Sequence, residues 1–117
     1  MFAATPLTYA LVAVSGDALI GMAIYHPTFS SFLVKSGIWL DDLFVYQQHR
    51  GQGIGRALLA RLCEIAEAQD CARVDWLVSK DNARGINFYQ GIGGTVSDLG
   101  RLVRLDESAL VRLAHER

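Results

Sequence analysis

A glycine-rich segment in the middle of the chain has the residue types that bind an anion. It consists of Arg50, Gly51, Gln52, Gly53, Ile54 and Gly55, with Arg56 directly after it. Three glycines within five residues let the backbone turn tightly and direct successive N–H groups at one point. The two arginines and the positive end of a following helix favour phosphate as the anion. A glycine-rich turn without a ligand is the alternative on these local features alone.

The spacing of the glycines excludes two well-known phosphate loops. A dinucleotide fingerprint counted from Gly51 requires glycine where Arg56 stands, and one counted from Gly53 requires glycine or alanine where Leu58 stands. A P-loop requires Gly-Lys-Ser/Thr at the start of the helix, and this sequence is absent. The remaining pattern is Arg50-x-x-Gly53-x-Gly55, between an apolar strand and a helix.

Two adjacent acids, Asp41 and Asp42, interrupt a predicted strand over residues 38–46. Alternation along a strand would place one carboxylate on each face of the sheet, so one would be buried unless a bulge redirects it. The pair therefore departs from the local pattern of a strand. One exposed acid and one acid that caps the bulge is the alternative.

Hydrophobic periodicity predicts the elements that position these residues. Residues 7–14 and 18–25 alternate around a Ser-Gly-Asp turn and predict a hairpin, and residues 26–37 predict a loop. The middle of the chain predicts the strand 38–46, a helix over 54–69 and a strand over 73–79. The last part predicts a short helix that is capped by Asn82 and ended by glycines at 91–94, then a strand over 102–105 and a helix over 108–115. On the apolar side of the long helix we expect Ala57, Leu58, Leu62, Ile65 and Ala66.

Length and composition indicate one mixed domain over residues 1–117. Apolar residues make up 51% of the chain, charged residues 20%, and the formal net charge is −1. Without a basic cluster we expect no nucleic-acid partner, and without a long apolar run no membrane segment. Cys63 and Cys71 lack metal-ligand spacing with the histidines, so we expect no metal site and a reduced, partly buried pair in a cytoplasmic protein.

Three segments together carry a resemblance to a known family. They are Leu40-Asp41-Asp42-Leu43-Phe44-Val45, the segment from Arg50 to Gly55, and Asn82 followed by Ile86-Asn87-Phe88-Tyr89. In order and spacing they resemble the GCN5-related N-acetyltransferases, specifically the spermidine/spermine (diamine) branch, from about Tyr9 to Ala114. The resemblance implies an α/β (α+β mixed) fold with a mixed, mostly antiparallel central sheet and flanking helices, lacking the family's usual first strand and helices.

The resemblance also implies a cofactor, acetyl-CoA, and the residues that bind it. The pyrophosphate of coenzyme A would lie on the glycine loop, and the pantetheine arm would add to the strand at Leu43, Phe44 and Val45 through backbone groups. Asn82 would help to hold the cofactor near the start of the next helix. A backbone N–H of the same strand would polarise the acetyl carbonyl.

Acetyl transfer to an amine requires a neutral amine and a protonated leaving thiolate. A phenol can protonate a thiolate, and Tyr89 matches the tyrosine that the family uses as this general acid. Read without the family, a tyrosine after a phenylalanine on a short helix is more typical of core packing. Asp41 matches the acid that meets the substrate amine, with Asp42 beside it, and we expect it to hold the cation and pass its proton through water. Trp76 lines the acceptor channel or fills the core.

The chain also departs from the family pattern. It starts at the hairpin, so we expect a more open acceptor side and an exposed first strand that favours a homodimer, which the resemblance independently implies. Asp81, Leu99 and Gly100 stand where relatives have other residues, which weakens the prediction of a polyamine substrate. The leading prediction is an acetyl-CoA-dependent N-acetyltransferase for a small primary amine. The alternatives are a truncated, catalytically silent acyl-CoA-binding module and an interaction domain without a cofactor.

Overall fold

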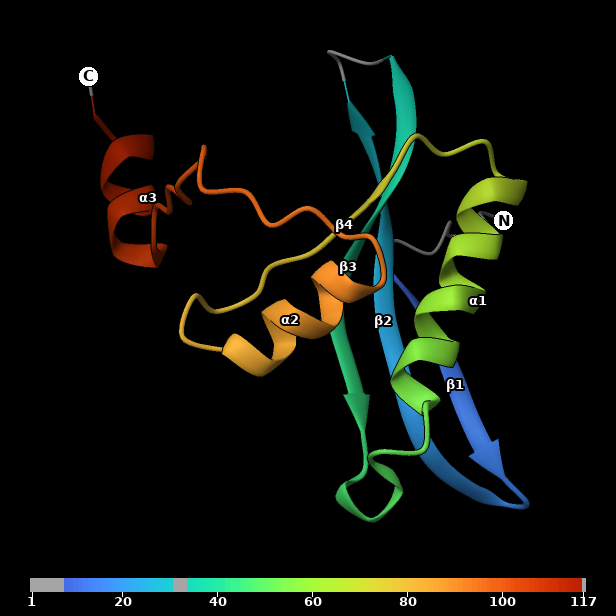
Figure 1. Ribbon diagram of the computed structural model, residues 1–117. Coiled ribbons are helices and arrows are strands. Elements are labelled where there is room, and N and C mark those ends of the chain that lie inside the picture. Colours follow the sequence, from blue (N-terminus) through green and yellow to red (C-terminus); the bar gives the residue numbers. More distant parts are fainter. Residues whose placement is uncertain (1–7, 31–33, 117) are drawn as a thin grey trace, which may run out of the picture. The chain divides into compact units, whose positions relative to one another are not determined.

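The computed structural model describes residues 8–30 and 34–116 of the 117-residue chain. The chain divides into two compact units, a first unit from Met1 to Leu77 and a second unit from Val78 to Arg117. The first unit holds the sheet and the long helix, and the second unit holds two short helices (Figure 1). The single domain over residues 1–117 stays a prediction.

A hairpin forms one edge of the described sheet, as the sequence predicts. β1 (Tyr9–Ser15) and β2 (Ala18–Ser30) pair in antiparallel register along the whole of β1. Gly16 in the connecting turn has a φ of 60°, in the left-handed region that glycine enters without a steric penalty. Leu7, the first residue of the predicted strand, lies outside the described residues.

The loop predicted over residues 26–37 is wrong at residues 26–30 and 35–37, which are strand, whereas residues 31–33 lie outside the described residues. β2 continues to Ser30, and β3 (Lys35–Val45) starts three residues before the strand that the sequence predicts. The two strands form a long antiparallel ladder. Pro27 is tolerated inside β2 because, in the described residues, the pairing of β2 with β1 ends at Tyr25. The proline and hydroxyl residues here indicated a loop, but they lie on a strand that lacks a ladder on that side.

β4 (Val74–Asp75) lies on the opposite side of β3 from β2. It pairs in parallel with Ile38 and Trp39 of β3, so the strand order is β1-β2-β3-β4 and the sheet is mixed and mostly antiparallel. This arrangement confirms the predicted fold class. The strand predicted over residues 73–79 is wrong outside β4, since only Val74 and Asp75 pair with β3, at Ile38 and Trp39.

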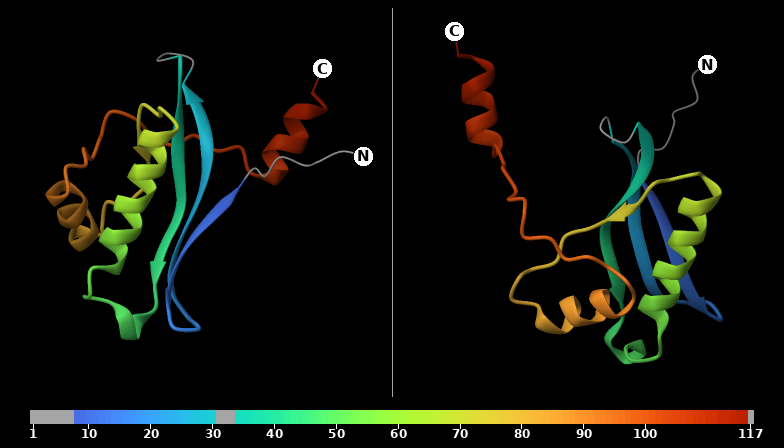
Figure 2. Two further views of the ribbon diagram at one scale, coloured as in Figure 1. Left: turned by 90° about the vertical axis from the view of Figure 1, so that its right-hand side faces the viewer. Right: turned by 45° about the horizontal axis from the view of Figure 1, so that its top comes forward.

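The long helix α1 (Ile54–Ala68) covers one face of the sheet (Figure 2). It confirms the predicted helix and ends one residue earlier. Gly21 on β2 permits the close approach, because a Cβ there would lie 3.0 Å from the carbonyl oxygen of Phe44 and 3.4 Å from side chains of Ile54 and Leu58. The buried apolar side chains of helix and strands form one core: Ile20, Ala23, Ile38, Leu40, Leu58, Leu59, Leu62 and Ala66.

Three residues of α1 differ from the predicted pattern. Ala57, expected on the apolar side, is exposed, and Leu59 is buried in its place. The periodicity predicted the buried side of the helix correctly, but it assigned Ala57 instead of Leu59 to that side. Cys63 is exposed and Cys71 is half-buried, and both are free thiols, so only one member of the predicted pair is partly buried.

The second unit contains α2 (Ala83–Gly91) and α3 (Glu107–Ala114), which confirm both predicted helices. The strand predicted over residues 102–105 is wrong, because these residues form no regular structure. A strand requires a neighbouring strand for its backbone hydrogen bonds, and none pairs with this segment in the described part of the chain. No helix in that part is long and apolar enough to cross a membrane.

Candidate functional site

The glycine loop lies between a short 3-10 helix, η1 (Gln47–His49), and α1. Gly51 has a φ of 81° and Gly53 a φ of 78°, which is backbone that residues with a side chain rarely adopt. A Cβ at either position would meet nothing within 4 Å. Glycine is therefore required at both positions for backbone conformation, and the space beside them is open to a ligand.

The first turn of α1 presents hydrogen-bond donors to the loop. Gly53 is the N-cap residue, no side chain caps the helix, and no acidic residue lies in its first turn. The first helical hydrogen bond runs from the N–H of Ala57 to the carbonyl of Gly53. Within the described residues, the N–H groups of Ile54, Gly55 and Arg56 have no protein acceptor. These donors and the helix dipole form a site suited to a phosphate group.

Arg50 has a structural contact that the sequence did not predict. Its Nε donates a hydrogen bond of 3.0 Å to the carbonyl oxygen of Val45, the last residue of β3. This bond fastens the start of the glycine loop to the end of the strand. The phosphate contact expected of Arg50 stays a prediction, and so does that of Arg56, which is exposed in the first turn of α1.

The end of β3 has one paired and one open edge. Leu43, Phe44 and Val45 pair with β2 on one side. On the other side the parallel ladder with β4 ends at Trp39, so in the described residues no strand pairs with this part of β3. Open N–H and C=O groups on a strand edge can accept another extended chain. The predicted binding of a pantetheine arm to these three residues agrees with this open edge.

Asp41 forms the bulge that the pair of acids predicts. Ile24 of β2 pairs with Asp42, whereas the next residue, Tyr25, pairs with Leu40, so Asp41 is the extra residue of β3. Both carboxylates are exposed, and neither is buried in the core. The bulge lies two residues after Trp39, where the parallel ladder of β3 with β4 ends.

His26 is the functional candidate that the sequence reasoning missed. Its Nδ1 lies 2.6 Å from Oδ2 of Asp41, and the two side chains are 37% and 41% exposed. His26 was assigned to a loop, whereas it lies on β2 in register with Trp39. The sequence contained a signal for this position. If the predicted strand over residues 18–25 is continued past Tyr25, His26 lies on β2, next to the strand that carries Asp41 and Asp42.

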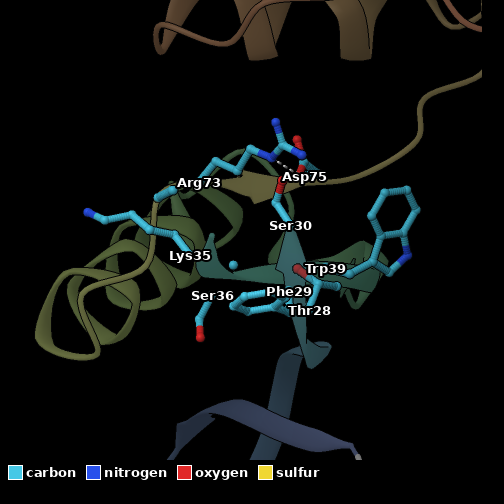
Figure 3. A pocket seen from close by; sticks show the side chains of 10 residues that line it. Thr28, Phe29, Ser30, Lys35, Ser36, Trp39, Arg73 and Asp75 are labelled. Carbon is cyan, nitrogen blue, oxygen red and sulfur yellow. Dashed lines mark ion pairs between the residues drawn. The ribbon is translucent and has the colours of Figure 1, made fainter. Parts of the chain in front are cut away.

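An open pocket of about 220 Å³ lies at the far end of the β2–β3 ladder from the glycine loop. Figure 3 shows its polar side, where Arg73 Nε and Asp75 Oδ2 form an ion pair of 3.0 Å. Trp39 lines another part of the pocket. Register places His26, Trp39 and Asp75 in one row across β2, β3 and β4, so these side chains share a face of the sheet.

The second unit holds Asn82 and Tyr89. Asn82 caps α2, since its Oδ1 accepts a hydrogen bond of 2.9 Å from the N–H of Gly85. A Cβ at Gly85 would lie 2.4 Å from Nδ2 of Asn82, so the glycine makes room for the cap. Tyr89 is half-buried, with its ring centroid 5.4 Å from that of Phe88.

Comparison with known proteins identifies the family that shares this arrangement. The sequence profile of the Acetyltransferase (GNAT) family matches residues 2–93. The chain belongs to this family. The match includes the hairpin, the bulged strand, the glycine loop, Asn82 and Tyr89.

Individual relatives agree with the GNAT assignment. The chain is 36% identical over 90 residues to L-ornithine N5-acetyltransferase NATA1 of Arabidopsis thaliana. The aligned segment covers 77% of this chain and 40% of that protein. It is 31% identical over 81 residues to spermine/spermidine N(1)-acetyltransferase of Bacillus subtilis. This aligned segment covers 67% of this chain and 53% of that protein. The chain therefore spans about half the length of the curated relatives that it matches.

A solved structure has a similar fold over most of this chain. An integron cassette protein from the mobile metagenome of V. cholerae superposes with a TM-score of 0.86 and 30% identity. The superposition covers 93% of this chain and 67% of that chain.

The GNAT chain brings most of its predicted site residues together in the first unit. Asp41, Asp42, the strand 43–45 and the loop 50–56 all follow one another along β3 and into α1. Trp76 lies directly after β4 and is half-buried, so it is adjacent to the strand on which it was expected. In the described residues no group of three or more histidine, cysteine or acidic residues could hold a metal ion.

Proposed function

We propose that the chain transfers an acetyl group from acetyl-CoA to a primary amine of a small molecule. The uncapped first turn of α1, with Gly51 and Gly53 at positive φ before it, is the observation that carries this proposal. Three backbone donors without protein acceptors among the described residues lie there, directly after two glycines whose surroundings are open. That arrangement fits a pyrophosphate, and the family match makes coenzyme A the pyrophosphate compound of choice.

The residues present fit coenzyme A at two places. The loop from Gly51 to Gly55 would hold its pyrophosphate through backbone N–H groups, and Arg56 would add positive charge. The open edge of Leu43, Phe44 and Val45 would pair with the pantetheine arm as with another strand. When bound, the cofactor supplies an acetyl thioester. The chain's own contribution is to fix the direction from which an amine approaches it.

The exposed acids at the bulge support an amine as the acceptor. Asp41 and Asp42 place two carboxylates on the surface at the point where β3 and β4 separate. A carboxylate attracts an ammonium group and orients it by hydrogen bonds. Two relatives are named for ornithine and for spermine and spermidine, which are aliphatic amines. Together these facts support a small amine with at least one primary amino group.

Tyr89 is the proposed general acid for the departing thiolate. A phenol hydroxyl can donate a proton to sulfur as the bond between carbon and sulfur breaks. The position of Tyr89 on a helix capped by Asn82 agrees with the family pattern in residues 82–89. Its role requires that α2 be held in place when the amine and the thioester meet.

A homodimer is proposed as the working form. Residues 99–105 support it, because they contain apolar side chains that are largely exposed, among them Leu99 at 100% and Val103 at 87%. Exposed apolar segments of this size are typical of interaction surfaces. Multi-angle light scattering on the purified chain should give twice the monomer mass, and a monomer at micromolar concentration would contradict it.

One experiment tests the proposed activity. Thiol release from acetyl-CoA is measured with a panel of diamines, polyamines and basic amino acids, while calorimetry measures coenzyme A binding to the same protein. We expect turnover with at least one primary amine. Binding of coenzyme A without turnover of any amine would show a silent acyl-CoA-binding module. No binding at all would contradict the whole proposal.

A further inference from the structure

The contact between His26 and Asp41 fixes which ring nitrogen is available for chemistry. An ionised carboxylate only accepts hydrogen bonds, so the Nδ1 that lies 2.6 Å from Asp41 Oδ2 carries the hydrogen. In a neutral imidazole the other nitrogen, Nε2, then has a free lone pair. Asp41 thus holds the ring in the tautomer that can take up a proton at Nε2.

We infer that His26 is the general base for the amine and that Asp41 orients it, an inference that rests on the proposed acetyl transfer. An alkyl amine is mostly protonated at neutral pH and must lose a proton before it can attack. Imidazole is a stronger base than carboxylate, so His26 is better suited than Asp41 to take this proton. Asp41 is then a positioning residue that also stabilises the imidazolium ion, as a carboxylate does in other pairs of this kind.

The protons and bonds of the step balance. Nε2 of His26 takes one proton from the ammonium group, and the freed lone pair forms a carbon–nitrogen bond at the thioester carbonyl. The carbon–sulfur bond breaks, and the thiolate takes a proton from the hydroxyl of Tyr89. The second proton of the attacking nitrogen returns to Tyr89 through solvent, and His26 gives its proton to solvent. The net reaction releases one proton.

The position of His26 on the sheet suits an approaching amine. His26 and Thr28 lie two residues apart on β2, so their side chains point to the same face, and Thr28 lines the open pocket. Trp39, the register partner of His26, lines the same pocket. The imidazole is 37% exposed, so an amine that enters along this face can reach it.

The alternative is an ordinary surface ion pair without a catalytic role. Exposed pairs of this kind contribute about 0–1 kcal/mol to folding, and their loss leaves chemistry unchanged. The two explanations therefore differ in their effect on the rate and agree in predicting a folded variant. Rate measurements on single and double variants can separate them.

The rate test uses His26→Gln, Asp41→Asn, the double variant and, as a matched control, His115→Gln at the C-cap of α3. Loss of a general base should lower kcat/KM about 100-fold in His26→Gln. The double variant should be no slower than His26→Gln, because the two residues act as a unit. In His26→Ala, added imidazole should restore part of kcat. Unchanged kcat/KM in His26→Gln, with an active wild-type chain, would overturn the inference and leave the proposed function standing.

A second measurement does not depend on turnover. Nitrogen-15 NMR of the imidazole rings reports which nitrogen carries the hydrogen, and His26→Gln identifies the signals of His26 among the three histidines. We expect Nδ1–H as the dominant neutral tautomer, and a shift toward Nε2–H in Asp41→Asn. A dominant Nε2–H form in the wild-type chain would overturn the inference. A wild-type chain that acetylates no amine would contradict the proposed function itself.

Discussion

The two units of the chain are stabilised in different ways. Every buried apolar side chain among the described residues lies in the first unit, between the sheet and α1. The helices α2 and α3 of the second unit contain no buried residue. Instead, side chains cap both helices, Asn82 at the N–H of Gly85 and Asp106 at the N–H of Ala109. The first unit is held by a core and the second by local hydrogen bonds.

This difference divides the proposed reaction between a unit that has a core and a unit whose helices contain no buried residue. The glycine loop, the open edge of β3, Asp41 and His26 all belong to the first unit. Tyr89, the proposed acid, belongs to the second unit. Binding of the pyrophosphate and activation of the amine should therefore depend on the first unit, whereas thiolate protonation by Tyr89 and any contact of Asn82 with the cofactor should depend on the second. Variants in each unit can test this separation.

The largest effect is expected for Tyr89→Phe. Loss of the acidic hydroxyl should lower kcat about 100-fold, because the thiolate must then leave unprotonated. The affinity for coenzyme A should stay within twofold of wild type, since the loop is in the other unit. Steady-state kinetics and calorimetry measure the two quantities. Tyr9→Phe, on the exposed edge of β1, is the matched control, and an equal rate for both variants would remove Tyr89 from the mechanism.

A smaller effect, confined to binding, is expected for Gly53→Ala. A side chain at a φ of 78° is strained by about 1–2 kcal/mol, so the loop should leave the conformation that directs its N–H groups at phosphate. We expect about a tenfold weaker affinity for coenzyme A by calorimetry. Gly55→Ala is the control, because its Cβ would meet Val45 at an ordinary 3.9 Å without positive φ. Equal affinities for the two variants would show that backbone conformation at Gly53 does not govern binding.

The same division explains how far the sequence predicted the molecule. The hairpin, the end of β3, the helix α1 and the glycine turn were predicted correctly because local periodicity and turn chemistry determine them. The bulge was foreseen only as the alternative to one buried carboxylate, and its position at Asp41 comes from the pairing of β2 with β3. The extension of β2 through His26 was missed because Pro27 and its hydroxyl neighbours are typical of loops, and only pairing with β3 makes them a strand. The contact of His26 with Asp41 was missed for the same reason.

In the second unit the sequence predicted the features that depend on neighbouring residues. It failed to predict the segment whose structure depends on a partner strand elsewhere in the chain. Asn82 as a cap and both helices follow from short-range patterns, and they are confirmed. The strand predicted over residues 102–105 is a short, mostly apolar run, yet a strand forms only beside another strand. Its sequence contains no information about whether such a partner is present.

The smallest effect concerns the cap of α2. Glycine inside a helix normally costs about 0.5–1 kcal/mol relative to alanine, so Gly91→Ala, with no atom within 4 Å of its new Cβ, should stabilise α2. Gly85→Ala should not, because its Cβ would lie 2.4 Å from Nδ2 of Asn82 and displace a cap worth about 1 kcal/mol. Amide hydrogen exchange in α2 measures both effects.

A double variant shows whether the cap is the cause. In an Asn82→Ala background the cap is already lost, so Gly85→Ala should stabilise α2 as Gly91→Ala does in the wild-type chain. Exchange rates in α1 should stay the same in all these variants if the core holds the first unit by itself. Faster exchange in α1 on loss of the Asn82 cap would show that the two units unfold together, and the separation of binding from protonation would then fail.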